Sequence, residues 1–472
     1  MSADPWGGYN TAETASEATL SSLDDVVVDE QHHGQVRLAY RLAARYAGKL
    51  MHVYGLGWFA WDGRRWAEDT RGACQRAVID VIRRALAGSV NDPQLRRDVT
   101  RCETDPGIRG VLAIAAALVP FAFTIDDLDA DPYLLNVANG TLDLRTMQLL
   151  EHAPADRITK VTRGAYRIDA VGAAWGDFVA TVLPDAEVRG YLQRLAGLSL
   201  LGKVVEHIFT IATGTGANGK GTAYNALLHT IGDYGHVAEP DLFMQAKSNP
   251  NAASPAQMGL RGRRLVVVSE TERDHRLAVA LMKNLTGGDP ITARPLYGRP
   301  VTFLPSHTAL LVTNFLPKVA GDDPAAWRRI RVVPFDVVIP ADQQDGHLGE
   351  RLELDADAIL AWTIEGYRQY ELRGMDAPDA VRIATGNYLK TSDAIARFVA
   401  ETCYLSPHAY STTGDLHARW TRWAVEDGAE PMSAKRFAVA LDEHGYPVAG
   451  GTGRNRRNRY GLGLLADEDD DE

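Results

Sequence analysis

The stretch HIFTIATGTGANGKGT, from His207 to Thr222, decides the fold that this sequence predicts. A β-rich run ends at Thr213, glycines recur at 214, 216 and 219, and a lysine then opens a helix-like segment. Phosphate groups need closely spaced backbone N–H donors without side chains in the way, and they gain from a helix N-terminus. The stretch therefore predicts a phosphate-binding loop, in which the Lys220 ammonium contacts the β- and γ-phosphates of a nucleotide.

The predicted nucleotide contacts are Gly214, Thr215, Gly216, Ala217, Asn218, Gly219, Lys220, Gly221 and Thr222. The usual pattern has Ser or Thr directly after the lysine, where its hydroxyl holds Mg²⁺. Because Gly221 stands there, we expect either Thr222 or a water molecule to take that role.

Two other structures are compatible with the same letters. A dinucleotide-binding GxGxxG turn needs an acidic residue at the end of a second strand about 20 residues later. Asp233 stands near that distance, but the preceding LLHTIGD resembles the end of a helix rather than of a strand. A glycine-rich turn without a ligand is the other alternative. The residues that follow distinguish these interpretations.

Two carboxylates follow the next β-rich run, residues 265–269. In an extended chain Glu270 and Glu272 point to the same side. One can hold Mg²⁺ through water, while the other orients or deprotonates the attacking water. Taken alone, the pair is also typical of a solvated strand end. Its position about 50 residues after the glycine-rich loop favours the catalytic interpretation.

Polar residues also follow the later β-rich run at 309–313. Asn314 closes that run, where an amide can contact the γ-phosphate or the catalytic water, although an isolated Asn there is often a turn residue. Arg328 and Arg329 come shortly afterwards. An arginine at a subunit edge can reach a neighbour's γ-phosphate and stabilise transition-state charge. The alternative is a solvated surface cluster.

The bulk properties are those of a globular protein with two to four domains, since domains run to about 100–200 residues. No uninterrupted apolar stretch of about 18 residues occurs, and the N-terminus carries no basic-then-apolar leader. The three cysteines are far apart, which indicates a reducing compartment and argues against a structural zinc site. The net charge is −11, but the run at 467–472 supplies six acidic residues and RNRRNR at 454–459 is basic.

The pattern changes along the chain. Residues 36–50 have helical spacing, GWFAWDGRRW at 57–66 predicts a hairpin turning at Asp62-Gly63, and 71–118 is mostly helical. NVANGTLDL at 136–144 predicts a second hairpin, turning at Asn139-Gly140, and 175–201 is helical again. Strands at 207–212, 265–269, 309–313 and 330–335 alternate with helical or loop segments, which predicts an α/β layered domain.

The C-terminal part has the outline of a winged helix–turn–helix. Residues 350–400 have a helical pattern, and helices are expected at 415–425 and 434–444. Ser433 is the expected N-cap of the last helix and Gly445 lies just past its end. A Gly/Arg-rich hairpin follows.

The order GTGANGKGT, VVVSETE, LMKNLTGGDPITARPLYG, LLVTN and WRRIRVVPF resembles a superfamily 3 helicase, in particular the phage and plasmid primase-helicase family with its poxvirus-like helicase arrangement. GWFAWDGRRWAED, LLNVANGTLDLRT and HAPADRITK resemble the accessory domain that precedes the motor in that family. The resemblance implies an AAA+ type P-loop core, with Glu270 and Glu272 as the Walker B acids. It also implies Asn314 as the sensor, Arg328 and Arg329 as finger candidates acting in trans, and ATP and Mg²⁺ as cofactors, the metal held by Thr222 and Glu270.

The resemblance also implies a DNA-contacting hairpin between the acids and Asn314, here residues 291–304. Basic side chains bind phosphate and an aromatic ring stacks on a base; a plain solvated β-turn is the alternative. The expected DNA contacts are Lys283, Arg294, Tyr297 and Arg299 in the motor, Lys435 and Arg436 on the last helix, and Arg454, Arg456 and Arg457 on the wing, next to Arg459.

We therefore expect an ATP-dependent DNA helicase for phage or plasmid replication, a homo-hexameric ring that translocates on single-stranded DNA and docks on duplex through the winged helix. Larger family members carry a primase module, but the region before the helical linker is short for one and lacks a Cys/His cluster. Asp127, Asp129 and Asp131 are interpreted as solvated turn residues rather than metal ligands. Alternatives are a primase-helicase that makes primers, a replication initiator that binds DNA without unwinding it, and a packaging or defence ATPase. A separate primase or initiator is a candidate partner.

The predicted division of the chain is an acidic disordered arm (1–30), an α+β accessory domain (31–165), a helical linker or collar (166–202), the ATPase core (203–340), a helical segment (341–403), a winged helix (404–465) and an acidic tail (466–472). We expect the protein to act in the cytoplasm of a bacterial host cell, without contact to a membrane.

Overall fold

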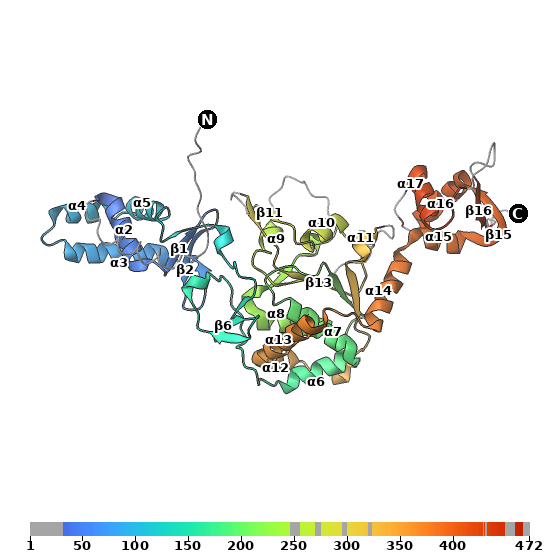
Figure 1. Ribbon diagram of the computed structural model, residues 1–472, viewed down its shortest axis with the longest axis horizontal. Coiled ribbons are helices and arrows are strands. Elements are labelled where there is room, and N and C mark those ends of the chain that lie inside the picture. The colour runs from blue at the N-terminus through green and yellow to red at the C-terminus, as the bar shows by residue number, and fades with distance from the viewer. Residues whose placement is uncertain are drawn as a thin grey trace, which may run out of the picture.

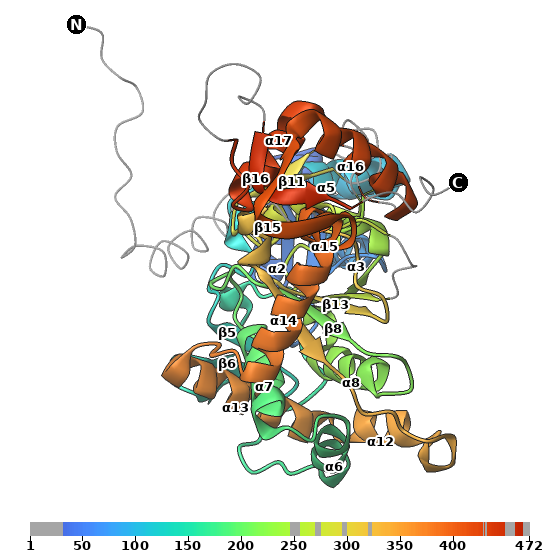
Figure 2. The same cartoon turned by 90° about the vertical axis from the view of Figure 1, so that its right-hand side faces the viewer.

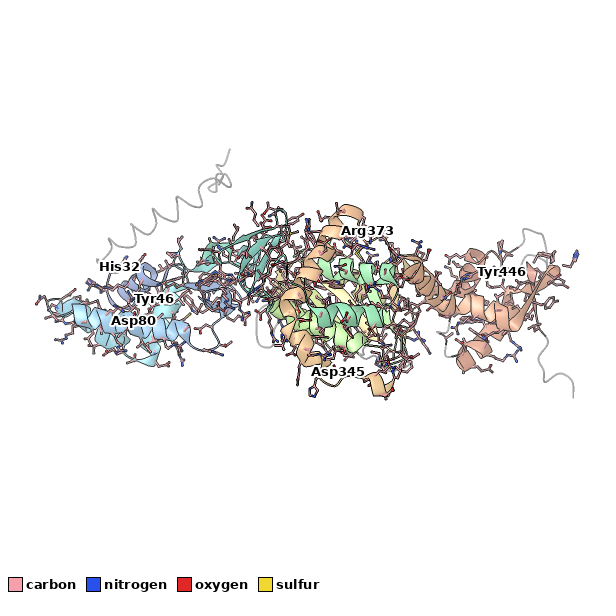
Figure 3. All side chains as sticks on the ribbon, turned by 90° about the horizontal axis from the view of Figure 1, so that it is seen from below. His32, Tyr46, Asp80, Asp345, Arg373 and Tyr446 are labelled. Atoms are coloured by element: carbon pink, nitrogen blue, oxygen red, sulfur yellow. The ribbon has the colours of Figure 1, made fainter. Side chains whose placement is uncertain are left out.

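The computed structural model describes residues 32–245, 255–269, 275–294, 300–319, 323–427, 429, 432–448 and 458–465. The expected N-terminal arm and acidic tail lie outside these ranges. The described part is elongated, with separate hydrophobic cores in an N-terminal, a central and a C-terminal lobe (Figure 1). Seen from below, the lobes follow one another in a row, with Tyr46 and Asp80 in the first, Arg373 in the second and Tyr446 in the third (Figure 3).

The N-terminal lobe combines a helical cluster with a small sheet. Its helices are α2 (Gly34–Tyr46), α3 (Ala73–Gly88), α4 (Pro93–Cys102) and α5 (Asp105–Ala115). Its sheet has the order β3-β2-β1-β4, from β1 (Leu50–Val53), β2 (Gly57–Trp61), β3 (Trp66–Glu68) and β4 (Ala122–Phe123). The β2–β3 hairpin pairs Trp61 with Trp66, as the sequence predicts. The first helix ends earlier than expected, because Leu50 pairs with Ala60 in the sheet.

A second small sheet, β5 (Leu134–Val137), β6 (Gly140–Asp143) and β7 (Gln148–Leu150), joins the N-terminal lobe to the central one. Val137 pairs with Gly140, so the turn residues are Ala138 and Asn139, one position before the expected turn. Leu135 and Leu142 belong to the same hydrophobic core as the central sheet. This hairpin is therefore packed against the central lobe rather than against the N-terminal helices.

The central lobe is built on a parallel five-stranded sheet with the order β14-β8-β13-β10-β9. The strands are β8 (Phe209–Thr213), β9 (Gly235–Ala238), β10 (Leu265–Ser269), β13 (Thr308–Thr313) and β14 (Ile330–Pro334). Four of these were predicted, with bounds within two residues; β9 was not. The inner strands are buried nearly without interruption, as expected for a sheet covered on both faces.

Residues at alternating positions along the strands pack into two different hydrophobic cores. Ala212 and Val267 face a core that includes α6 (Ala173–Val182), α7 (Ala186–Leu198), α8 (Lys220–Ile231), α12 (Leu348–Leu354) and α13 (Ala356–Arg373). Ile211 and Val266 face a second core with α10 (Val279–Leu285), α11 (Pro324–Trp327) and α14 (Asp379–Ser392). The result is a layered α/β/α arrangement, with α7, α8 and α13 beneath the sheet in Figures 1 and 2.

Shorter elements complete the central lobe. They are α9 (Pro255–Met258), the hairpin of β11 (Ile291–Ala293) with β12 (Val301–Phe303), and the 3-10 turns η1 (Ile125–Asp127), η2 (Pro154–Asp156), η3 (Gly232–Tyr234), η4 (Pro240–Leu242) and η5 (Ala341–Gln343). The hairpin strands fall within the predicted 291–304 segment. Its tip, 295–299, lies outside the described residues.

Helix α14 leads from the central lobe to the C-terminal lobe (Figures 1 and 2). That lobe runs α15 (Ala394–Thr402), β15 (Cys403–Thr412), α16 (Thr413–Asp427), α17 (Ala434–Glu443) and β16 (Asn458–Leu464). Phe398, Trp420 and Phe437 form its aromatic centre. Ser433 caps α17 by accepting from Arg436 N, and Gly445 follows at φ +85°, both as predicted.

The last strand has a partner that the sequence did not predict. β16 pairs along its length with β15, which precedes both helices. Val448 forms an antiparallel bridge with Arg459, and most of the expected hairpin between them lies outside the described residues. Within the part of the chain that the structure describes, no helix has the length and apolar character needed to cross a bilayer.

Helices α7 and α13 cross at two glycines. A Cβ on Gly197 would lie 2.0 Å from Tyr367 N, and one on Gly366 would lie 1.9 Å from Gln193 O. Both obstacles are backbone atoms, which cannot move aside as a flexible side chain does. The close approach of these helices, on which α8 packs, therefore depends on the missing side chains.

We expect Gly366→Ala to lower the free energy of unfolding of the central lobe by about 1–3 kcal/mol, as overpacking does. Gly386→Ala in α14 is the matched control. Its Cβ would meet nothing within 4 Å, so it should be neutral or stabilise by up to about 1 kcal/mol. Urea denaturation followed by circular dichroism measures both. Equal midpoints for the two variants would contradict the glycine crossing.

Candidate nucleotide site

The 214–219 loop owes its shape to glycines at two positions. A Cβ on Gly214 would lie 2.3 Å from Phe335 O and 2.2 Å from Asn218 Nδ2. Gly219 has φ +76°, and its Cβ would lie 2.5 Å from Val182 of α6. The left-handed Gly219 forms the N-cap of α8, so the helix begins at Lys220. The loop therefore ends at a helix N-terminus, where backbone N–H groups are available to an anion.

Lys220 lies inside this loop with 6% of its surface exposed. Its ammonium donates to Gly214 O at 2.9 Å, Asn218 Oδ1 at 3.0 Å and Asn314 Oδ1 at 3.0 Å. All three acceptors are neutral, and burial lowers the pKa of the ammonium. Among the described residues no carboxylate lies within salt-bridge distance of Lys220. A cation held only by neutral oxygens fits an anionic ligand such as a phosphate.

Asn218 connects the lysine to the neighbouring strand. Its Oδ1 accepts from Lys220, and its Nδ2 donates to Phe335 O, directly after β14, at 3.1 Å. Phe335 N donates in turn to Thr213 O at 2.8 Å, and Ile339 N donates to Ala217 O at 2.8 Å. The sequence placed Asn218 among the loop residues but did not predict this bridging role, because its partner lies 117 positions away.

The carboxyl ends of three neighbouring strands meet at this loop. Thr313 of β13 stands opposite Thr213 of β8, and Val312 stands opposite Ser269 of β10. Asn314 follows β13 directly and contacts Lys220, so the predicted sensor and the predicted loop are together. Ser269 ends β10 at the same edge, one position before Glu270. Glu270 and Glu272 themselves lie outside the described residues.

The remaining loop residues differ in exposure. Thr215 and Ala217 are exposed, whereas Gly216, Gly221 and Thr222 are half-buried. Gly216 and Ala217 have positive φ angles of 105° and 49°. Thr222 lies in the first turn of α8, which is compatible with either of the two Mg²⁺ arrangements predicted.

Asp233 does not have the place that a dinucleotide fold requires. It lies in η3 after α8, before β9 rather than at its end. Its carboxylate pairs with Arg65 and accepts from Val161 N at 3.1 Å. This acid therefore joins segments of the fold and is occupied by protein donors.

The two finger candidates have different surroundings. Arg329 is 8% exposed and its guanidinium donates to Ala325 O at 2.8 Å. Arg328 is exposed and lies beside it at the end of α11. Of the two, only Arg328 has a side chain accessible from outside the chain.

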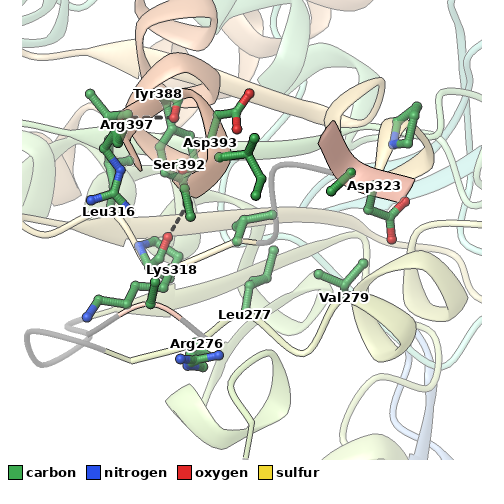
Figure 4. Close-up of a pocket in the computed structure, with 18 of the residues that line it drawn as sticks. Arg276, Leu277, Val279, Leu316, Lys318, Asp323, Tyr388, Ser392, Asp393 and Arg397 are labelled. Atoms are coloured by element: carbon green, nitrogen blue, oxygen red, sulfur yellow. Dashed lines mark hydrogen bonds between the residues drawn. The ribbon is translucent and has the colours of Figure 1, made fainter. Parts of the chain in front are cut away.

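A cavity of about 880 Å³ lies between the central lobe and the C-terminal lobe (Figure 4). It is lined by the central-lobe residues Arg276, Lys318 and Arg328, by α14, and by Arg397 and Arg436 of the C-terminal lobe. Its acids are engaged: Asp323 with Lys283, Asp427 with Arg397, and Asp393 with His444. No residue of the 214–222 loop lines it. This cavity and the loop are distinct places on the molecule.

The predicted DNA contacts divide into three groups. Lys283 donates to both carboxylate oxygens of Asp323, at 2.8 and 2.6 Å. Asp323 also caps α11 by accepting from Ala326 N. Arg294, Lys435 and Arg436 are exposed. Tyr297, Arg299, Arg454, Arg456 and Arg457 lie outside the described residues.

Arg459 was expected beside the wing arginines, and this expectation was wrong. It is fully buried and donates to Asp442, Ala438 O, Tyr446 O and Thr413. Its hydrogen bonds to Asp442 and Ala438 O tie β16 to α17.

The alternating acids before β5 have structural roles. Asp127 accepts from Thr124, Asp129 accepts from Thr159, and Asp131 forms a two-point pair with Arg145 at 2.7 and 2.9 Å. All three are half-buried rather than fully solvated. Within the described ranges, no group of His, Cys, Asp and Glu has the arrangement of a metal site.

Two family models match the chain. One, described as D5 N terminal like, covers residues 39–184, and the other, described as a family of unknown function (DUF5906), covers residues 212–329. The second match includes the whole 214–222 loop, β10, Asn314 and both arginines. The predicted resemblance to the phage primase-helicase family is confirmed: the chain matches both models, and its relatives are viral proteins named as putative helicases and primases.

The relatives are named as putative helicases and primases. A putative helicase of Acanthamoeba polyphaga mimivirus is 29% identical over 296 residues, covering 58% of this chain and 31% of that protein. A putative helicase of Frog virus 3 is 28% identical, covering 52% and 27%. A putative primase of African swine fever virus is 23% identical, covering 74% and 38%. The chain thus spans about a third of the length of these curated relatives.

Among solved structures, the apo C-terminal region of NrS-1 overlaps 92% of this chain and 100% of that chain, with a TM-score of 0.48 and 8% identity.

We expect Asn218→Ala to weaken ATP binding about tenfold, since it removes one acceptor of the Lys220 ammonium and the loop's donor to Phe335. Asn225→Ala is the control, because Asn225 is exposed on α8, the helix that follows the loop. Titration with a fluorescent ATP analogue measures both affinities. Unchanged affinity in Asn218→Ala would show that the bridge does not organise the loop.

Proposed function

We propose that this chain is the motor of an ATP-dependent DNA helicase that acts in phage or plasmid replication in a bacterial host. The observation that carries the proposal is the contact of Lys220 with Asn314, which joins the glycine-rich loop to the end of the neighbouring strand. The similarity to putative viral helicases supports it. Because the chain covers a minor part of those relatives, the activity, substrates and partners remain proposals.

The strand order supports an AAA+ type P-loop core over 203–340. The loop follows β8, an inner strand, and its neighbour β13 ends at a polar residue. Ligands of open α/β sheets bind outside the carboxyl ends of the strands. A triphosphate on the 214–219 backbone would meet the Lys220 ammonium from the loop side and the Asn314 amide from the sheet side.

Hydrolysis needs a metal and a positioned water beside this charge. We propose that Glu270 and Thr222 hold Mg²⁺, directly or through water, and that Glu272 orients the attacking water. The end of β10 at the shared sheet edge supports this assignment. The metal would supply neutralisation of charge on the transferred phosphoryl group.

Arg328 is the better finger candidate, because it is exposed while Arg329 is buried and bonded to Ala325 O. An exposed arginine reaches a neighbour's γ-phosphate only when copies of the chain adjoin in a closed arrangement. We therefore propose a homo-oligomeric ring, a hexamer, with each nucleotide between two copies.

DNA would meet this ring in two places. The β11–β12 hairpin supports a pore-facing role for Arg294, Tyr297 and Arg299 on single-stranded DNA. The order α15, β15, α16, α17, β16 and the bridge of Val448 to Arg459 support a winged helix over 404–465 that docks on duplex. Exposed Lys435 and Arg436 would then contact backbone phosphates.

Primer synthesis is the second candidate, and the similarity to a putative viral primase is the observation that favours it. The two functions are separated by assaying incorporation of nucleotides on a bare template beside unwinding of a forked duplex. A DNA-binding initiator would show neither activity.

Lys220→Ala should lower DNA-stimulated ATP hydrolysis roughly 100-fold or more, because it removes the cation that the proposed site aims at the phosphates. DNA affinity at fixed salt should stay within about twofold, since phosphate contacts to DNA lie elsewhere. Lys390→Ala, at an exposed position of α14, should retain activity. Wild-type hydrolysis in Lys220→Ala would contradict the motor assignment.

Arg328→Ala should also abolish most hydrolysis, but through the neighbouring copy. Mixing equal amounts of the inactive Lys220→Ala and Arg328→Ala chains should restore hydrolysis at about a quarter of the interfaces, where each supplies what the other lacks. Arg329→Ala chains should hydrolyse ATP on their own, and mixing them with Lys220→Ala chains should add no further hydrolysis. No rescue with Arg328→Ala would argue against action in trans.

A further inference from the structure

The outer face of the C-terminal sheet carries three exposed tyrosines. Tyr404 and Tyr410 come from β15 and Tyr460 from β16, with 49%, 61% and 48% of their surfaces exposed. Tyr410 stands directly opposite Tyr460, and their ring centroids are 6.1 Å apart. On the other face of β16, Leu462 is fully buried. Aromatic rings are thus presented outward on a rigid, two-stranded support.

Tyr404 is held flat by a glycine on the opposite strand. It pairs in register with Gly463, and a Cβ on that glycine would lie 2.4 Å from the tyrosine Cζ and 2.6 Å from Cε1. The ring therefore lies across the backbone of β16, in the space that a side chain would otherwise fill. One ring face contacts the strand, and the ring is half-exposed on the other side.

The two strands that carry the tyrosines contain no carboxylate. Neither β15 nor β16 has an Asp or Glu, so the phosphates of a bound strand would meet no negative side chain from the strands themselves. Exposed aromatic rings on such a support fit single-stranded nucleic acid, since bases stack on ring faces.

We infer that Tyr404, Tyr410 and Tyr460 form a stacking platform for the bases of single-stranded DNA. The inference rests on the proposed DNA-directed function and adds to it a second single-strand site, outside the motor and distinct from α17. Base faces inside a duplex are covered by their neighbours, so only an unpaired strand presents them to these rings. The platform would hold a separated DNA strand beside the proposed hexameric ring.

The test compares two oligonucleotides of equal length and charge, oligo(dT) and its abasic counterpart, by fluorescence anisotropy with the full chain. Tyr404→Ala, Tyr410→Ala and Tyr460→Ala should each weaken oligo(dT) binding about 5- to 50-fold. The corresponding Phe variants should stay within about twofold, because the ring is kept. Tyr54→Ala, which removes an exposed tyrosine of the N-terminal lobe, is the matched control and should not change affinity.

Gly463→Ala keeps every tyrosine but places a methyl group against the Tyr404 ring, so it should weaken oligo(dT) binding as Tyr404→Ala does. The wild-type chain should prefer oligo(dT) over the abasic strand, and the alanine variants should lose most of that preference. Equal wild-type affinity for both strands would overturn the platform, even if a variant fails to fold. Unchanged oligo(dT) affinity in all three alanine variants would also overturn it, and would leave the face to a protein partner.

ATP hydrolysis without DNA separates this inference from the proposed function. The tyrosine variants should hydrolyse ATP at the wild-type basal rate, since none of these residues lies near the 214–222 loop. If the platform is overturned while ATP hydrolysis and unwinding are intact, the motor assignment is unaffected. Loss of hydrolysis in Lys220→Ala with base-selective binding intact supports both.

Discussion

The Lys220 ammonium is removed from water and surrounded by three neutral oxygens, from Gly214, Asn218 and Asn314. Among the described residues no anion pairs with this ammonium, which is a costly arrangement, and burial lowers the lysine pKa. The surrounding structure sustains this arrangement through the Asn218 bridge to Phe335 and the packing of Val182 on Gly219. A phosphate would provide a negative charge for the ammonium, so the same contact organises the loop and favours its ligand.

The sheet determines where this charge lies. Parallel strands bring their carboxyl ends to one edge, and the order β14-β8-β13-β10 places the loop beside Asn314 and the end of β10. The helices under the sheet are held close by the glycine crossing of α7 and α13. Core packing far from the loop thereby supports the position of α8, whose first residue is Lys220.

Local patterns predicted most of these elements. Buried runs such as LVVVS have the length and composition of an inner parallel strand, and Ser433 and Gly445 mark the ends of α17 correctly. The resemblance of the motifs to a known family predicted that the 214–222 loop and Asn314 are parts of one site. Long-range pairings were not predictable: β16 pairs along its length with β15, and Arg459 is buried by partners up to 46 positions away. The choice between Arg328 and Arg329 depends on burial, which one sequence does not reveal.

The most direct test of the account is a structure determined with a non-hydrolysable ATP analogue and Mg²⁺. The account predicts the triphosphate on the 214–219 backbone, with the Lys220 ammonium on the β- and γ-phosphates and the Asn314 amide within hydrogen-bonding distance of the γ-phosphate. An analogue bound in the cavity between the lobes, or one whose phosphates lie away from Lys220, would contradict it.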